Sequence, residues 1–591
     1  MKLSDYIAQF LANEGVKCVF GISGGAILHI FDSVARNPNI DYVCPQHEES
    51  VAMAADGYSR VTGNLGAGMV TSGPGGTNML TGICSSYFDS IPTLFITGQV
   101  ATFRLKRGKT VRQVGFQETD IVSIFETVTK YCILLKDPTQ IKYHLQKAVY
   151  LAKSGRPGPV IIDLPDDLQR VDIDPNKLEG FTPPKKQLDS VKLTDDITKC
   201  LDLISAAQRP IFIFGAGISI AHAQNQIREL VDKLNIPFVL TWGAKDIWPH
   251  NHPLNVGGLG IAGPRFGNFS VQSSDLIIAM GTRLSQMLTG GKLEYFGREA
   301  KKVLIDIDVE EFNKFDGKEI TIDLPILAEI KSFLGSMNER LSNYQAPAYS
   351  SWLGQISSWR EEFPIVSPKD HTDKKPVDAC VFAETLSEEC KDNDVIIVDT
   401  GGNLTWTMQS FKVKANQKIF SAWNHSPMGY SLAAACGAAL ADRSREIICI
   451  IGDGGLQMCI EELATVSRHQ LSIKIFLFNN HCHGIQKHTI KTWLGGRLEG
   501  VDHESGLHFP DFNKVAEAYG LPNTTIKEHD SLKEQIRDVL NSPGPMFCNV
   551  EINPEQTMDP YLTFGRPLED LGPPLSRETL RKKLLIKPVD I

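Results

Sequence analysis

Residues 447–455 read IICIIGDGG, and this stretch decides the fold of the last third of the chain. The apolar run 447–451 predicts a strand, and the turn 452–455 leads into a helical pattern. A strand without polar residues is typical of a parallel sheet that is covered by helices on both faces. A second apolar strand, 473–478, ends at Asn479 and Asn480. The two turns are therefore expected at one edge of the same sheet.

The same alternation of apolar strands and helical patterns extends over the whole chain. A length of 591 residues is too great for a single core. Intervals rich in Pro and polar residues interrupt the pattern twice. We predict an α/β protein with three doubly wound parallel-sheet domains at 1–172, 190–342 and 376–553, followed by a tail at 554–591.

The composition excludes several classes of protein. The chain is 42% hydrophobic and 22% charged, with a formal net charge of -9, which is ordinary for a globular protein. It has no basic stripe that would bind nucleic acid and no apolar run of about 20 residues that would span a membrane. The N-terminus does not resemble a signal or transit peptide. The twelve cysteines form no CxxC pair, so we expect reduced thiols and a cytoplasmic location.

The turns after the two strands carry groups that suit a diphosphate and a metal ion. Glycines allow the backbone to approach a diphosphate at a helix N-terminus. Asp453 offers an anionic oxygen and Asn480 a neutral one, and Mg²⁺ prefers oxygen ligands that it shares with phosphates. A plain strand–turn–helix is the alternative. A zinc site at 481–483, which reads His-Cys-His, is not expected, because adjacent residues do not easily converge on one tetrahedron.

This combination of GDG, helix, strand and Asn-Asn resembles enzymes that depend on thiamine diphosphate (ThDP), most closely acetolactate synthase catalytic subunits and similar carboligases. The resemblance implies that Mg²⁺ is held by Asp453, the Asn480 side chain and the Cys482 carbonyl. It also implies that the diphosphate is approached by Gly402, Asn403, Gly454 and Gly455. The first domain would then bind the pyrimidine ring, and the third the diphosphate.

Other segments extend the resemblance. Glu48, in the segment His47-Glu48-Glu49, matches the glutamate that exchanges a proton with the pyrimidine ring, which is acid–base catalysis through the cofactor. Met428 matches the apolar side chain that holds the cofactor bent, although a core methionine is the alternative. The Ser426 carbonyl would bind the amino group. In the family, the two halves of each site come from different subunits, so a homodimer or homotetramer is implied.

The middle domain resembles the FAD-binding domain of acetolactate synthases. The implied FAD contacts are Gly215, Gly217, Arg283 and either Asp306 or Asp308. Any flavin would be structural, because carboligation transfers no net electrons. A vestigial domain that binds nothing is the alternative.

The substrate is expected to be a small 2-keto acid, with Gly24, Phe116, Gln117 and Thr489 in its pocket. The resemblance implies decarboxylation of pyruvate and transfer of the acetyl unit to a second carbonyl, which gives 2-acetolactate when the acceptor is pyruvate. Thr489 replaces the Trp that is usual in biosynthetic members. A longer segment after Val100 holds Arg104, Lys106, Arg107, Lys109 and Arg112. The alternatives are therefore a carboligase for a larger acceptor, such as a nucleotide-linked keto-sugar, and a pyruvate decarboxylase or oxidase. Nothing in the chain indicates a regulatory subunit, although the family has them.

Overall fold

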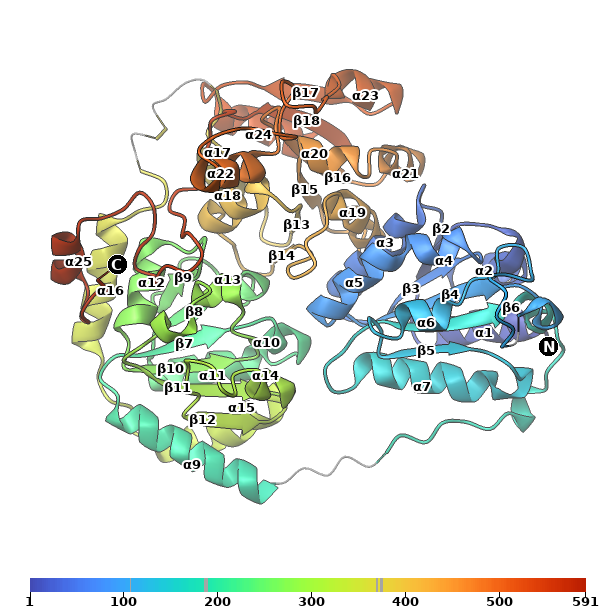
Figure 1. Cartoon of the computed structure of the whole chain (residues 1–591), viewed down its shortest axis with the longest axis horizontal. Helices are drawn as coiled ribbons and strands as arrows, with labels where there is room; N and C mark the ends of the chain where they lie inside the picture. Colours follow the sequence, from blue (N-terminus) through green and yellow to red (C-terminus); the bar gives the residue numbers. More distant parts are fainter. Residues whose placement is uncertain (107, 185–189, 368–369, 372–375, 591) are drawn as a thin grey trace.

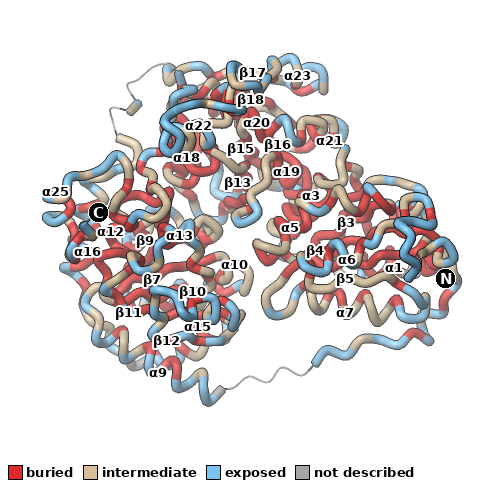
Figure 2. Tube along the Cα trace, in the orientation of Figure 1, coloured by how far each residue is buried: buried red, intermediate tan, exposed pale blue. Residues whose placement is uncertain are grey.

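The computed structural model describes residues 1–106, 108–184, 190–367, 370–371 and 376–590. Within them the chain forms three sheets, each of six parallel strands with helices on both faces (Figure 1). The predicted α/β fold of three doubly wound domains is confirmed. Arg107 lies outside the described residues. Figure 2 shows that the buried residues gather in the sheets and in the helix faces against them.

The first sheet has the order β2-β1-β3-β4-β6-β5. Its strands are β1 Cys18–Gly21, β2 Asp41–Val43, β3 Gly66–Val70, β4 Thr93–Gln99, β5 Tyr131–Leu134 and β6 Val160–Pro165. Its helices are α1 Leu3–Asn13, α2 Leu28–Arg36, α3 Glu48–Thr62, α4 Pro74–Asn78, α5 Leu80–Asp89, α6 Ile121–Phe125, α7 Ile141–Lys153 and α8 Asp166–Gln169. Two apolar clusters cover the two faces of this sheet, one with α1, α2 and α7 and the other with α3 and α5.

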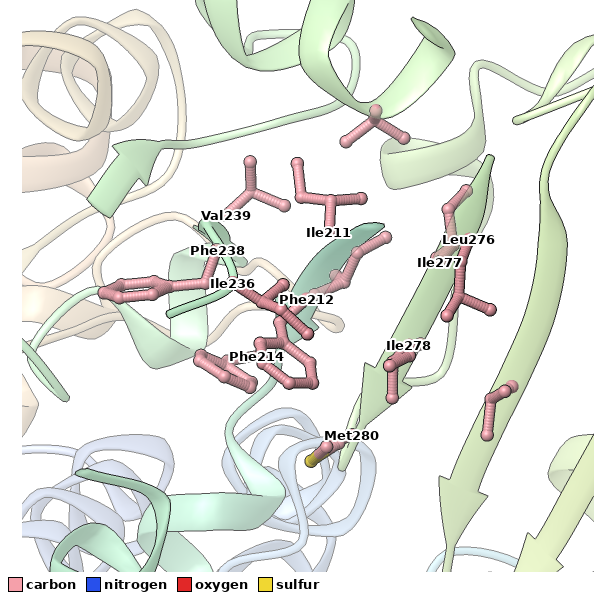
Figure 3. Close-up of a cluster of buried hydrophobic side chains, with 14 of the residues drawn as sticks. Ile211, Phe212, Phe214, Ile236, Phe238, Val239, Leu276, Ile277, Ile278 and Met280 are labelled. Carbon is pink, nitrogen blue, oxygen red and sulfur yellow. The ribbon is translucent and has the colours of Figure 1, made fainter. Parts of the chain in front are cut away.

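The second sheet has the order β12-β11-β10-β7-β8-β9. Its strands are β7 Pro210–Phe214, β8 Phe238–Leu240, β9 Asn255–Gly257, β10 Leu276–Met280, β11 Lys301–Asp306 and β12 Leu324–Leu327. Its helices are α9 Ser190–Ala206, α10 Gly217–Ile220, α11 Gln224–Leu234, α12 Arg265–Ser273, α13 Gln286–Thr289, α14 Glu310–Asn313, α15 Ile330–Arg340 and α16 Ser350–Glu362. Aromatic and branched side chains of β7, β8 and β10 fill its core (Figure 3).

The third sheet repeats the strand order of the first, as β14-β13-β15-β16-β18-β17. Its strands are β13 Val395–Val398, β14 Lys418–Phe420, β15 Ile447–Gly452, β16 Ile473–Asn479, β17 Asn523–Ile526 and β18 Met546–Glu551. Its helices are α17 Ala379–Glu389, α18 Gly402–Ser410, α19 Tyr430–Ala441, α20 Asp453–Gln457, α21 Glu462–His469, α22 Gly484–Trp493, α23 Phe512–Ala518 and α24 Leu532–Asn541. In this order the chain reverses its winding between β13 and β15, which is where such sheets bind ligands.

The tail returns to the middle domain, although it follows the third sheet along the chain. Leu562, Leu568 and Leu571 are fully buried in the middle core, and the last helix, α25 Arg577–Lys583, lies beside α16 (Figure 1). The Leu562 N–H donates to the Ile261 carbonyl at 2.8 Å. Helix α16, within the polar interval, buries its tryptophans in the same core. Both segments therefore complete the middle domain.

Helices α3 and α19 join the first domain to the third. A Cβ on Gly437 would lie 1.9 Å from the Ala54 carbonyl oxygen, and a Cβ on Gly57 would lie 2.3 Å from that of Ala434. The backbones therefore touch, and these pairings make the two helices antiparallel. This contact fixes where the functional residues of the two domains lie relative to each other.

Candidate active site

The carboxyl edge of the third sheet gathers the residues that the sequence singled out there. Strand β13 leads to Asp399 and β15 to Asp453, and these two strands flank the point where the winding reverses. Strand β16, beside β15, ends one residue before Asn480. The N-termini of α18 and α20 begin at the same edge. Helix N-termini present unpaired N–H groups, which favour an anion.

Three oxygen-bearing groups converge at this edge. The Asn480 amide lies 3.2 Å from Asp453 Oδ2 and 2.8 Å from the Cys482 carbonyl oxygen, with its own oxygen turned toward both. Three facing oxygens repel one another unless a cation lies among them or the amide turns so that its nitrogen donates. Burial raises the pKa of Asp453 to about 7, and a bound cation would keep the carboxylate ionised. Hard oxygen donors of this kind fit Mg²⁺.

The glycines at this edge are required by close contacts. A Cβ on Gly402 would lie 2.6 Å from the Trp406 ring, and a Cβ on Gly455 would lie 2.0 Å from an Asp399 oxygen. The Asn403 amide donates to the Asp399 carbonyl at 2.7 Å and holds the turn. A side chain at either position would push the backbone away from Trp406 or Asp399. Glycine at these turns lets the backbone approach a ligand such as a diphosphate closely.

The segment that carries Met428 is fixed by Asp399. The Asp399 carboxylate is fully buried and accepts hydrogen bonds from the N–H groups of Gly429 at 3.0 Å and Ser431 at 3.2 Å. Burial raises the pKa of Asp399 to about 7. Ser426 has a positive φ of 56°, which marks a constrained turn. The carboxylate thus holds the backbone on the C-terminal side of Met428.

Met428 and His483 meet above Gly454. A Cβ on Gly454 would lie 3.0 Å from Met428 Cε and 2.5 Å from His483 Nε2. The His483 ring also lies 6.2 Å from the Phe509 ring, and burial lowers the pKa of this histidine. A thioether and an imidazole therefore cover the same turn of the backbone.

Glu48 begins helix α3 in the first domain. Its Oε2 accepts a hydrogen bond from the Asn78 amide at 3.0 Å, and the His47 side chain caps the helix by accepting from the Glu49 N–H at 3.2 Å. The structure therefore places Glu48 at a helix N-terminus, in contact with the glycine-rich segment that contains Asn78.

Within one chain, Glu48 and Met428 lie at opposite ends of the α3–α19 pair. Arg60, near the far end of α3, lies 5.9 Å from the Tyr430 ring at the start of α19. Glu48 is twelve residues before Arg60, which is roughly 18 Å along a helix. One chain therefore does not bring its own Glu48 to the edge that carries Asp453.

The residues expected in the substrate pocket fall into two groups. A Cβ on Gly24 would lie 2.5 Å from Thr71 Cβ, and a Cβ on Gly73 would lie 3.0 Å from Gln117 Cβ, all at the carboxyl edge of the first sheet. Phe116 is 86% exposed. Thr489 is instead on α22 of the third domain, where its hydroxyl donates to the Ile485 carbonyl at 2.9 Å. The first group, like Glu48, therefore lies on the first domain.

The residues expected to bind FAD have contacts of their own. A Cβ on Gly215 would lie 2.1 Å from the Gly281 carbonyl oxygen, and one on Gly217 would lie 2.7 Å from Gly281 Cα, so packing alone requires both glycines. Arg283 donates to the Asn424 side chain of the third domain. Asp306, at the end of β11, accepts from the Asp308 N–H at 3.0 Å, and burial raises its pKa to about 6.

Comparison with known proteins agrees with this geometry. Models of the thiamine pyrophosphate enzyme match as an N-terminal TPP-binding domain at residues 1–124, a central domain at 197–337 and a C-terminal TPP-binding domain at 399–550. A probable acetolactate synthase large subunit of Methanocaldococcus jannaschii is 33% identical, over 99% of this chain and 97% of its own length. The chain belongs to the thiamine pyrophosphate enzyme family. Thiamine pyrophosphate is another name for ThDP.

Further relatives in this family carry the same name. The acetolactate synthase large subunit of Porphyra purpurea is 31% identical over 94% of this chain and 92% of its own length. The acetolactate synthase of Arthrospira platensis is 32% identical over 95% of this chain and 96% of its own length. This chain is therefore a ThDP-dependent enzyme whose resemblance to acetolactate synthases extends over all three domains. Within the described residues, none of the helices is long and apolar enough to cross a membrane.

Several residues in and around this site could not be assigned a role from the sequence. Asp399 directly follows a strand and lies two residues before Gly401, and that position was the available signal. Asn78 lies in a glycine-rich turn, residues 73–78, and that turn was its only signal in the sequence. His483 was considered only as a zinc ligand. Glu462 gave no signal, because its partners lie in another domain.

Proposed function

We propose that this enzyme decarboxylates pyruvate and joins the remaining acetyl unit to a second pyruvate, forming 2-acetolactate. The names of the full-length relatives support this activity. The convergence of the Asp453, Asn480 and Cys482 oxygens beside the diphosphate-binding turns is the structural observation that carries it. Two pyruvate anions and one proton then yield acetolactate and CO₂.

The proposed roles of the residues follow from the edge of the third sheet. Asp453, Asn480 and the Cys482 carbonyl would hold Mg²⁺, and the diphosphate would be bound by Gly402, Asn403, Gly454 and Gly455. Met428 and the Ser426 carbonyl would orient the pyrimidine ring. When bound, ThDP supplies an electron sink for the charge left by loss of CO₂. Glu48 would exchange a proton with the pyrimidine ring.

A homodimer is the smallest assembly that we propose. Glu48 and Met428 lie at opposite ends of the α3–α19 pair, so a second copy would have to supply Glu48 to each diphosphate site. Exposed Phe116, on the same domain as Glu48, would be covered by the same contact. The cytoplasm is the proposed compartment, supported by twelve cysteines that are all free.

FAD is the weaker of the cofactor predictions. The glycines of the middle domain are explained by packing, and Arg283 is engaged by Asn424. Asp306 alone keeps the arrangement that binds a ribose, a buried acid after a strand of a doubly wound sheet. An absorption spectrum of the purified protein decides the question, because a bound flavin is yellow and the apoprotein is colourless.

Pyruvate is the proposed acceptor in preference to a nucleotide-linked sugar, because the relatives are named acetolactate synthases. The segment that suggested a larger acceptor is organised by its own glutamate. Glu118 accepts from the N–H groups of Lys106 at 2.6 Å and Val114 at 2.8 Å. The turn of this segment is therefore held by Glu118 through the backbone, without an anionic ligand.

The test is an assay of purified protein with ThDP, Mg²⁺ and pyruvate, in which CO₂ is followed and the products are identified. We expect acetolactate as the main product. The variant Glu48→Gln should bind ThDP but turn over at least about 100-fold more slowly, because general acid–base groups contribute at least that much. Acetaldehyde as the main product, or oxygen uptake, would contradict the proposal, as would full activity of the variant.

A further inference from the structure

Glu462 is a buried carboxylate that the proposed mechanism does not use. It begins helix α21 in the third domain and is 0% exposed. Burying a carboxylate is costly unless its oxygens accept hydrogen bonds. Its Oε2 accepts from the Thr465 hydroxyl at 2.6 Å within the same helix. The remaining donors come from a different domain.

Those donors surround Glu48. Glu462 Oε1 accepts from the Gln46 N–H at 2.8 Å and from the His47 N–H at 3.3 Å. The Ser50 hydroxyl, one turn into α3, is a further hydrogen-bond partner of the carboxylate. The third domain thus holds the chain directly before Glu48 and just after it.

These contacts restrict where the Glu48 carboxylate can be. Among the described residues, its side chain accepts a hydrogen bond from Asn78, and its position otherwise depends on the backbone that bears it. The N–H groups of Gln46 and His47 precede the helix and lack helical partners. Glu462 supplies their acceptor, and its negative charge at a helix N-terminus is favourable. Without that acceptor, the backbone before Glu48 would have to turn toward another partner or toward water.

We propose that Glu462 is a positioning residue for Glu48, acting through the backbone of Gln46 and His47. The inference rests on the proposed function, in which Glu48 exchanges a proton with the pyrimidine ring of ThDP. The chemistry explains why a carboxylate lies here, since Oε1 accepts from two backbone N–H groups, Oε2 accepts from the Thr465 hydroxyl, and Ser50 is a further partner. The contact between α3 and α19 already joins the two domains, so the hydrogen bonds of Glu462 are not needed for that purpose.

The test measures the step that Glu48 promotes, in the absence of pyruvate. Deuterium exchange at the thiazolium C2 of bound ThDP is followed by quenching and NMR, and ThDP affinity is titrated separately. Glu462→Leu should slow exchange by at least about tenfold, because misplacing a catalytic group by about 1 Å can cost up to ~100-fold. Its ThDP affinity should stay close to wild type, since Asp453 and the glycine turns are untouched. Glu462→Gln should retain most of the exchange, because its oxygen can accept from the N–H groups and its amide can donate to the hydroxyls.

A second measurement uses the protein without cofactor. In Glu462→Leu, the amide hydrogens of residues 44–50 should exchange faster with solvent, while those of α19 stay protected. Glu461→Gln is the matched control, because in the described part of the chain it is Glu462, and not this neighbour, that accepts from Gln46 and His47. If Glu462→Leu fails to fold, Thr465→Val replaces it, since it removes one donor from the same carboxylate and should slow C2 exchange partially.

The outcomes separate the two hypotheses. If the wild-type protein binds ThDP without accelerating C2 exchange, the proposed function is contradicted, whatever the Glu462 variants do. If the wild type accelerates exchange and Glu462→Leu or Thr465→Val does so equally, the positioning role is overturned. An equal loss in Glu461→Gln, or a loss of ThDP affinity in parallel with exchange, would also overturn it.

Discussion

The Tyr430 hydroxyl donates a hydrogen bond to Asp56 at 2.5 Å and so links the start of α19 in the third domain to the middle of α3 in the first. Both side chains are buried. Asp56 also pairs with Arg60 at 2.6 Å, and Arg60 pairs with Asp89 at 2.7 Å. This charged network lies at the end of the helix pair that is closest to Met428.

Replacing this tyrosine should destabilise the contact between the domains. Tyr430→Phe removes a hydrogen bond to a buried carboxylate, and we expect a loss of about 1–3 kcal/mol, seen as a lower midpoint of thermal unfolding. Tyr349→Phe is the control, because its buried hydroxyl donates to the neutral Ile204 carbonyl at 3.3 Å within the middle domain. A smaller loss in Tyr430→Phe than in the control would contradict this account.

Adding one methyl group between α3 and α19 should prevent their close packing. The Cβ of Gly437→Ala would lie 1.9 Å from the Ala54 carbonyl oxygen, so the helices must separate, and we expect a loss of at least about 3 kcal/mol or no soluble protein. Gly335→Ala, in α15, has open space around the new Cβ and should stabilise by about 0.5–1 kcal/mol. Thermal unfolding of the two variants tests the pair, and equal midpoints would exclude backbone contact as the cause.

The stability should depend on pH through Asp163. Burial raises the pKa of this aspartate from 3.8 to about 7, while Thr97 and Gln99 donate to its two oxygens. Between these pKa values the folded protein holds one more proton than the unfolded chain, so this group's contribution to stability falls as pH rises through the window and stays low above it.

Asp163→Asn should remove that dependence. Its oxygen can accept from the Gln99 amide, and its nitrogen can donate to the Thr97 hydroxyl. The variant should gain in unfolding midpoint over wild type at about pH 8 and lose that advantage toward about pH 4, with each pKa unit worth about 1.4 kcal/mol. A difference that does not change with pH would show that Asp163 keeps its ordinary pKa.

Removal of divalent cations should release ThDP. With EDTA, the oxygens of Asp453, Asn480 and Cys482 would face the diphosphate without a cation, and like charges repel. We expect ThDP affinity to fall by at least about tenfold, as measured by titration of the intrinsic fluorescence. Excess Mg²⁺ should restore binding to the wild type but not to Asp453→Ala. An unchanged ThDP affinity in EDTA would show that no divalent cation contributes to ThDP binding.

The acceptor preference should respond to residue 489. Thr489→Trp restores the side chain that is usual in biosynthetic members, and it should raise the share of product formed with 2-ketobutyrate when both keto acids compete. Thr492→Trp, on the exposed part of the same helix, is the control and should leave the ratio unchanged. Product ratios by chromatography decide between them, and a parallel shift in both variants would point to an unspecific effect of the tryptophan.

The position of Asp453 and Asn480 at one edge of the third sheet could be predicted from local sequence. Strand β15 is apolar throughout because helices cover both faces of its sheet, and the polar residues follow at its end. The same pattern in β16 predicted that Asn480 would lie near Asp453, and the structure brings the two side chains within 3.2 Å. Because parallel strands end at the same edge of a sheet, the end of each apolar run predicts that the residues after it lie at that edge.

Other contacts could not be predicted, because their partners are distant along the chain. Gln46 and Glu462 are 416 residues apart, and the local pattern around each residue does not predict a contact with the other. The tail appeared separate from the domains, yet its leucines complete the core of the middle domain. Nothing in the periodicity of an element identifies which distant surface will cover it.

The sequence by itself determined the three parallel sheets, the order of their elements and the chemical groups at their edges. These depend on strand and helix periodicity and on turn residues, which are local properties of the chain. Only the tertiary structure decided that Glu48 and Met428 lie at opposite ends of α3 and α19. It also decided that Asp399 binds the backbone just after Met428 and that Glu462 binds the backbone just before Glu48. The glycines that let these two backbones touch set that arrangement, and such a contact exists only once both domains have folded and packed.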